Sequence, residues 1–135
     1  MISARKLFLP FSLFVAMLLL PSCHNDGLSR EQRRVRRAAV HYYEYLQDGD
    51  SRRFVDHMAD ADVMPETYRS EMEDLVSEYA DDLQRQHGGI TSITALGDTI
   101  EGDFAHVYLQ LAFADSTEEQ VGVPMRRIED EWKMQ

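Results

Sequence analysis

Residues 105–113, AHVYLQLAF, decide the fold of this 135-residue chain. Ala, Val, Leu, Leu and Phe at the odd positions alternate with the more polar His106, Tyr108 and Gln110. A period of two over this length predicts a β-strand with one face on a core. Upstream of residue 90 the apolar residues follow a helical period, so this stretch lies in a sheet that follows a set of helices.

The first predicted helix begins after Ser29 and ends at Gly49. Ser29 and Gln32 have the spacing of a capping box, and glycine often terminates a helix. The apolar residues between them recur at steps of three and four and predict one buried stripe: Val35, Ala39, Tyr42 and Leu46. Asp50 can cap a second, shorter helix directly after the Asp48-Gly49-Asp50 corner.

A third helix is predicted from Pro65 to about Gln86. Proline fits the first turn because its missing N–H is not needed there, and Gly88-Gly89 can end the helix. Its apolar side chains also follow helical spacing and predict a second buried stripe: Tyr68, Met72, Leu75, Val76, Tyr79 and Leu83.

The rest of the chain predicts an antiparallel meander of about four strands. Turn residues stand at 101–103 and 114–116, and Pro124 indicates an edge position or a bulge in the following strand. A last hairpin at Glu129-Asp130 would bring Trp132 and Met134 beside that strand. Three helices followed by this meander predict an α+β domain over residues 29–135.

The start of the chain resembles a bacterial lipoprotein signal. A basic pair, Arg5-Lys6, precedes the apolar run Leu7 to Leu20, which is short for a membrane span, and Leu20-Pro21-Ser22-Cys23 resembles a lipobox. We expect a signal peptide at 1–22, a lipidated Cys23 and a tether at 23–28. The alternative is ordinary secretion with Cys23 as a free thiol. His24, in place of aspartate, favours the outer membrane of the bacterial cell envelope.

The charge distribution excludes one class of partner. The chain has a net charge of −10, and loss of Arg5 and Lys6 with the signal peptide makes it −10 − 2 = −12, which argues against nucleic acid. Five arginines crowd residues 30–37, whereas acidic residues dominate 66–82. We expect the arginines to serve packing and surface electrostatics, with contact to anionic headgroups as the alternative.

Several segments together resemble the nuclear transport factor 2-like, or cystatin-like, superfamily. They are the corner at 46–50, the strand at 102–109 and the closing 126–134, in this order of elements. Within the superfamily the chain is similar to small bacterial lipoproteins of unknown function. The resemblance implies a cone of helices closed by a curved sheet, which in some relatives holds a small apolar ligand and in others mediates protein contacts.

The resemblance also implies where a ligand would lie. The residues expected to line the cone are Tyr42, Tyr45, Leu75, Tyr79, Val107, Leu109, Leu111, Phe113 and Trp132. Enzymes of the superfamily, such as isomerases and dehydratases, place acids and bases inside the cone, and the candidates here include Tyr42, Tyr45, Tyr79, His106 and Tyr108. Each of these has a plainer interpretation as a core aromatic or a surface group.

No catalytic, metal or cofactor motif stands out. The five histidines show no ligand spacing, the Asp-rich corners lack the pattern of a calcium loop, and a phosphate-binding loop is missing from the sequence. We therefore expect no cofactor and no metal, and a non-enzymatic module that is anchored to the membrane through Cys23 and binds a protein or a small apolar ligand. The alternative is an isomerase-like or dehydratase-like enzyme that uses the cone.

Overall fold

The computed structural model describes residues 27–135 and has the predicted order of helices and strands. Helices α1 (Arg30–Gln47), α2 (Ser51–Asp56) and α3 (Glu66–His87) come first, with a short 3₁₀ turn η2 (Ala61–Val63) between the last two. The sequence analysis missed only η2. The predicted signal peptide, Cys23 and most of the tether lie outside the described residues.

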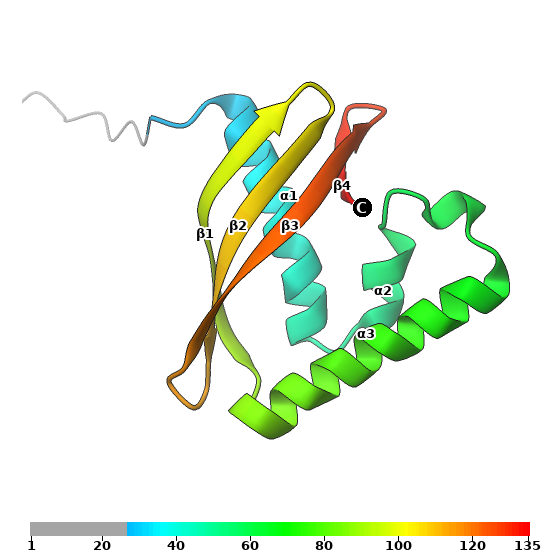
Figure 1. Ribbon diagram of the computed structural model, residues 1–135, viewed down its shortest axis with the longest axis vertical. Helices are drawn as coiled ribbons and strands as arrows, with labels where there is room; N and C mark the ends of the chain where they lie inside the picture. The colour runs from blue at the N-terminus through cyan, green and yellow to red at the C-terminus, as the bar shows by residue number, and fades with distance from the viewer. Residues whose placement is uncertain (1–26) are drawn as a thin grey trace, which may run out of the picture.

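Four antiparallel strands form one curved sheet in the order β1-β2-β3-β4 (Figure 1). They span β1 (Ile90–Glu101), β2 (Phe104–Phe113), β3 (Glu118–Ile128) and β4 (Glu131–Met134). The alternation predicted for residues 105–113 is confirmed, because the five odd-numbered side chains of β2 are buried. The α+β fold class is therefore confirmed.

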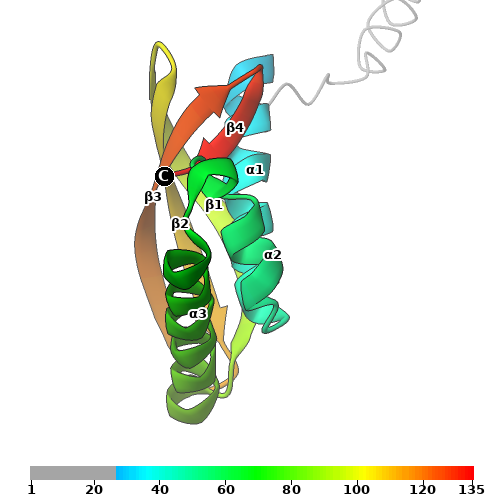
Figure 2. The same cartoon turned by 90° about the vertical axis from the view of Figure 1, so that its right-hand side faces the viewer.

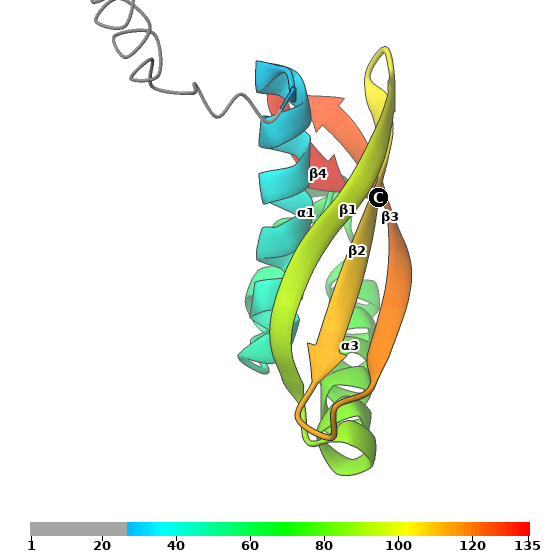
Figure 3. The same ribbon diagram turned by 90° about the vertical axis from the view of Figure 1, so that its left-hand side faces the viewer.

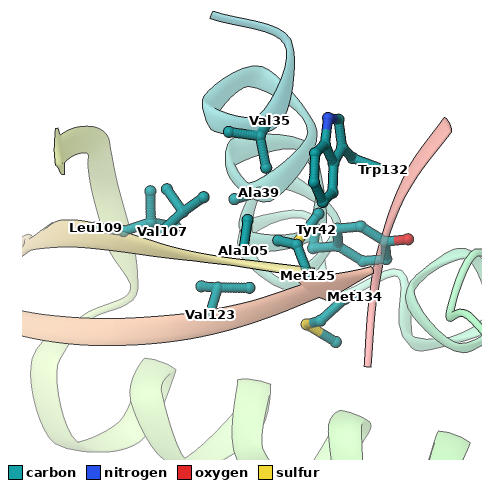
Figure 4. Close-up of a cluster of buried hydrophobic side chains, with 10 residues drawn as sticks. All are labelled: Val35, Ala39, Tyr42, Ala105, Val107, Leu109, Val123, Met125, Trp132 and Met134. Atoms are coloured by element: carbon teal, nitrogen blue, oxygen red, sulfur yellow. The ribbon is translucent and has the colours of Figure 1, made fainter. Parts of the chain in front are cut away.

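Helix α1 lies along the inner face of the sheet (Figure 3). The Ser29 side chain accepts from the Gln32 N–H, and the Gln32 side chain accepts from the Ser29 N–H, so the predicted capping box is present. All four residues of the predicted stripe are buried. Three of them pack with β2, β3 and β4 in the main core cluster, of which Figure 4 shows Val35, Ala39 and Tyr42.

Helix α3 lies below α1 and α2, and only its C-terminal end approaches the sheet (Figures 1 and 2). The predicted stripe on α3 is wrong as a buried face, because Leu83 is its one buried member. Leu75 is 59% exposed and Tyr79 39% exposed. The helical period is correct, but of the middle of this helix only Val76 and Ala80 pack against a core cluster, and both are half-buried.

The β3–β4 end explains two sequence features. β4 pairs only with Met125–Ile128 of β3, so Pro124 lies where β3 becomes an edge, as predicted. The Pro124 carbonyl accepts from the Gln135 N–H, and in a strand the nitrogen points to the same side, so no β2–β3 hydrogen bond is lost. In the turn itself, Glu129 and Asp130 adopt φ values of 49° and 67°, the conformation of a type I′ hairpin.

Within residues 27–135, no helix is both long enough and apolar enough to cross a membrane.

Candidate functional site

The residues predicted to line the cone fall into three places. Val107, Leu109, Leu111 and Phe113 are buried on β2 and contact other core side chains. Leu75 and Tyr79 are exposed on α3. Tyr42, Tyr45 and Trp132 come together at a depression where α1, β4 and the end of α2 meet. His106 and Tyr108 lie exposed on the outer face of the sheet.

Large side chains occupy the space between α1 and the inner face of the sheet. Tyr43 and Phe54 are each half-buried, and both contact the two clusters of buried core residues. Burial raises the pKa of Tyr43 to about 12, with smaller contributions from Tyr79 and Glu119. The phenol of Tyr43 is therefore neutral at physiological pH and acts as a packing group.

The candidate site is a depression of about 200 Å³ between α1, β4 and the end of α2. This volume is below the range of about 300–1,000 Å³ typical of ligand pockets, so it suits a group the size of one ring. Three elements supply its lining, which consists of Ala38, His41, Tyr42, Tyr45, His57, Glu131, Trp132 and Lys133.

Tyr42 and Trp132 form the deeper, rigid part of this depression, and Figure 4 shows them side by side between α1 and β4. The Trp132 Nε1–H donates to Glu31 Oε1 at 2.6 Å, and the guanidinium of Arg127 lies 5.5 Å from the centre of a Trp132 ring. The Tyr42 hydroxyl donates to the carbonyl of His57. Both polar groups are thus hydrogen-bonded, so Tyr42 and Trp132 present aromatic surface to the depression.

Burial raises the pKa of Tyr42 to about 12, and the nearby Tyr45 and Glu131 act in the same direction more weakly. A neutral phenol that already donates its proton to a carbonyl is a poor acid or base at pH 7. Tyr42 is therefore a wall of the depression and not a proton carrier.

Tyr45 and His57 form the outer aromatic side. Their ring centroids are 5.4 Å apart, and the ring of Tyr42 meets that of Tyr45 edge-on at 6.3 Å. His57 Nδ1 lies 2.8 Å from the carbonyl oxygen of Arg53, which can only accept, so Nδ1 carries the proton. In the neutral ring, Nε2 then has its lone pair available to a ligand or a proton.

The rim of the depression has charges of both signs. Lys133 and Glu131 come from β4, and His41 from α1 lies 3.5 Å from Glu44. Because the side chains of His41 and Glu44 are about half exposed, the contact between them contributes little energy. The rim can select the polar substituent of a ring, while the aromatic residues supply the contact area.

The sequence analysis missed His41, His57 and Lys133 as members of one site. His41 and Tyr45 are four residues apart on α1, which places them on one face of the helix, so this pair could have been found from spacing. His57 and Lys133 arrive from the end of α2 and from β4, and no local pattern indicates that they meet. In residues 27–135, no group of three or more His, Cys, Asp or Glu could hold a metal ion.

No family model matches the chain, and no curated protein matches its sequence. Solved structures do match. An NTF2-like protein from Campylobacter jejuni, described as a putative transpeptidase, superposes with a TM-score of 0.61 at 17% identity over 71% of this chain and 92% of its own. A de novo designed NTF2 fold protein, NT-9, gives a TM-score of 0.50 at 15% identity over 78% and 82%.

The chain has the nuclear transport factor 2-like (NTF2-like) fold. A protein from Novosphingobium aromaticivorans, described as NTF2-like with a cystatin-like fold, covers 96% of this chain and 86% of its own, at 15% identity and a TM-score of 0.43. The fold implied by the resemblance in the sequence is confirmed. The NTF2-like fold occurs in enzymes and in non-enzymes, so the fold alone assigns no activity.

Proposed function

We propose that this chain is a lipid-anchored protein of the bacterial envelope whose NTF2-like domain is a binding module without a reaction of its own. The anchor at Cys23 and the outer-membrane location rest on the sequence at residues 1–24. The binding site is the depression between α1, α2 and β4, and its occupant is a ring-sized aromatic or apolar group, either a free small molecule or one side chain of a protein.

A single observation carries the proposal. Three aromatic rings, those of Tyr42, Tyr45 and Trp132, converge on one depression, and two of them are held by hydrogen bonds to Glu31 and to the carbonyl of His57. Rigid aromatic surface binds with little loss of conformational entropy. Such a site is organised before its ligand arrives.

The lack of a free buried acid or base supports binding over catalysis. Within residues 27–135, no polar or charged residue other than tyrosine and tryptophan is buried as a whole, and the Asp98 carboxylate, whose side chain is 2% exposed, is engaged by Arg36 and Gln32. General acid–base catalysis in this fold class needs a positioned group in a water-poor site. The described core offers no such group.

One residue favours the enzymatic alternative. His57 has a fixed tautomer and an available Nε2 at the depression, so it could accept a proton from a bound substrate. Cyclohexanone, a ring-sized ketone, tests this in D₂O, because a base at the site would accelerate deuterium exchange at the α-carbon. We expect wild type and His57→Gln to give equal exchange. Faster exchange in wild type would replace the binding module by an isomerase-like enzyme.

The binding proposal is tested by titrating benzoate and benzyl alcohol into the protein and following ligand saturation transfer by NMR. We expect dissociation constants on the order of 1 mM, about −4 kcal/mol, which nine or fewer heavy atoms can provide. Tyr45→Ala should weaken binding about fivefold, because an aromatic contact contributes about 0.5–1.5 kcal/mol.

The matched control is Tyr108→Ala, which removes a tyrosine that is 46% exposed on the outer face of the sheet. It should bind both probes like wild type. Equal weakening by the two substitutions, or no saturable binding by wild type, would contradict the proposed site.

A further inference from the structure

The solvent side of α1 carries a stripe of basic residues at helical spacing. Arg30, Arg33, Arg37 and His41 follow one another at steps of three and four, and all four are exposed. With Arg34 and Ala38 they line a shallow depression of about 540 Å³. At 1.5 Å per residue the stripe runs for about 16 Å along the helix.

The remaining arginines of α1 are engaged by carboxylates, whereas two members of the stripe are not. Arg34 lies 3.3 Å from Glu31 and 3.6 Å from Asp130, and Arg36 lies 2.5 Å from Asp98. No carboxylate in the described part of the chain pairs with Arg30 or Arg37. Their charges are not neutralised within the domain.

The stripe begins at the end of the molecule farthest from the acidic helix. The first turn of α1 lies near the β1–β2 and β3–β4 turns, while α3, with seven acidic residues, lies at the opposite end (Figure 1). The domain is thus electrically polar although the chain has a net charge of −10. A flat anionic surface can contact the basic stripe without approaching α3. A polyanion that wrapped around the domain would also approach the acidic residues of α3.

We propose that the stripe of Arg30, Arg33, Arg37 and His41 docks on an anionic lipid bilayer. The outer side of α1 faces the headgroups, and α3 points away from the membrane. The chain enters the stripe directly from residues 1–29, and six residues separate Cys23 from Arg30, a span of at most about 25 Å over seven residue steps. The docking rests on charge complementarity, goes beyond the aromatic depression and does not require acylation of Cys23.

The test uses the full chain with Cys23→Ser, synthesised without cells in the presence of vesicles and separated by flotation. Phosphatidylcholine vesicles measure the membrane partition that the apolar residues 7–20 cause. Vesicles with 30% phosphatidylglycerol measure the same partition with negative surface charge added. We expect the ratio of anionic to neutral partition to fall roughly 30-fold in Arg30→Gln/Arg37→Gln, since each arginine near such a surface contributes about 1 kcal/mol. In 1 M salt, where screening acts over about 3 Å, wild type should lose its preference.

The matched control is Arg52→Gln/Arg85→Gln, which removes the same charge from exposed positions on α2 and α3. This variant should keep the wild-type ratio, and circular dichroism should show all three proteins folded. Equal ratios for the two double variants, or no anionic preference in wild type, would overturn the proposal. A chain that ignored the vesicles but showed shifted α1 amide signals with inorganic phosphate would assign the stripe to a soluble anion and also overturn it.

Discussion

Helices α1 and α3 both carry apolar residues at helical spacing, yet the domain stabilises them in different ways. α1 buries its whole stripe against the sheet, its flank beside β4 lines the aromatic depression, and its solvent side carries the basic stripe. α3 buries Leu83 and half-buries Val76 and Ala80 against a core cluster, but it leaves Leu75 and Tyr79 exposed. An apolar period shows that a helix has two faces, but the rest of the fold determines which face is covered.

Contacts near its ends hold α3 in place. Towards the N-terminal end, Arg69 pairs with Asp56 and donates to the carbonyl of Ala61. At the C-terminal end, His87 Nδ1 lies 2.8 Å from Asp115 of the β2–β3 turn. Gly88 ends the helix at φ 78°, where a Cβ would lie 2.9 Å from that of Ala114, so only glycine fits.

Substituting one leucine on each helix tests the difference between α1 and α3 most clearly. Leu46→Ala on α1 deletes a buried side chain that packs with Leu111 and Phe113, and it should lower the free energy of unfolding by about 2–5 kcal/mol. Leu75→Ala on α3 should change it by no more than about 0.5 kcal/mol. Urea unfolding followed by circular dichroism measures both.

A large loss in Leu75→Ala would show that the middle of α3 packs on the domain in solution. Equal losses in the two variants would remove the distinction between the helices.

Substituting one tyrosine on each helix tests the same difference through smaller changes in the free energy of unfolding. Tyr42→Phe removes the hydroxyl that donates to the carbonyl of His57, and it should cost about 0.5–1.5 kcal/mol by the same measurement. Tyr79→Phe on α3 removes a hydroxyl from a residue that is 39% exposed and should cost almost nothing. Equal and small effects would show that water replaces the Tyr42 hydrogen bond.

The sequence predicted the three α-helices and the meander of strands from their apolar periods and from clear ends, such as Ser29 before α1 or Gly88 after α3, but it missed η2. It did not predict that Leu75 is exposed, because burial depends on how far α3 is held from the sheet. It predicted Tyr42, Tyr45 and Trp132 as lining, but in the cone and not in the depression between α1, α2 and β4. His57 and Lys133 reach the site only through the tertiary fold, which the local spacing of residues does not indicate.

The smallest effect concerns the C-terminal contact of α3. Hydrogen bonds from Thr117, and then from His87, lower the pKa of Asp115 from 3.8 to about 2. A lowered pKa in the folded state contributes stability that is present above pH 3.8 and is lost as the pH falls through 2. The protection of the amides in the last turn of α3, measured against the intrinsic exchange rate at each pH, should therefore decrease between about pH 4 and pH 2.

Asp115→Asn should remove that decrease in protection within the same window. Asp60→Asn is a control, since that carboxylate pairs with Arg126 and is remote from α3's C-terminal end. An unchanged pH profile in Asp115→Asn would show that another group governs this end of the helix.

We propose that the depression between α1, α2 and β4, and not the cone, binds the ring-sized group. Benzoate titrated into the ¹⁵N-labelled protein tests it directly, through the indole N–H of Trp132 and the amides of Tyr45 and His57. We expect these signals to shift together and to saturate, while the amides of Leu75, Tyr79 and Val121 stay in place. Saturable shifts at Leu75, Tyr79 and Val121 with Trp132 unmoved would place the ligand between α3 and the sheet and contradict the claim.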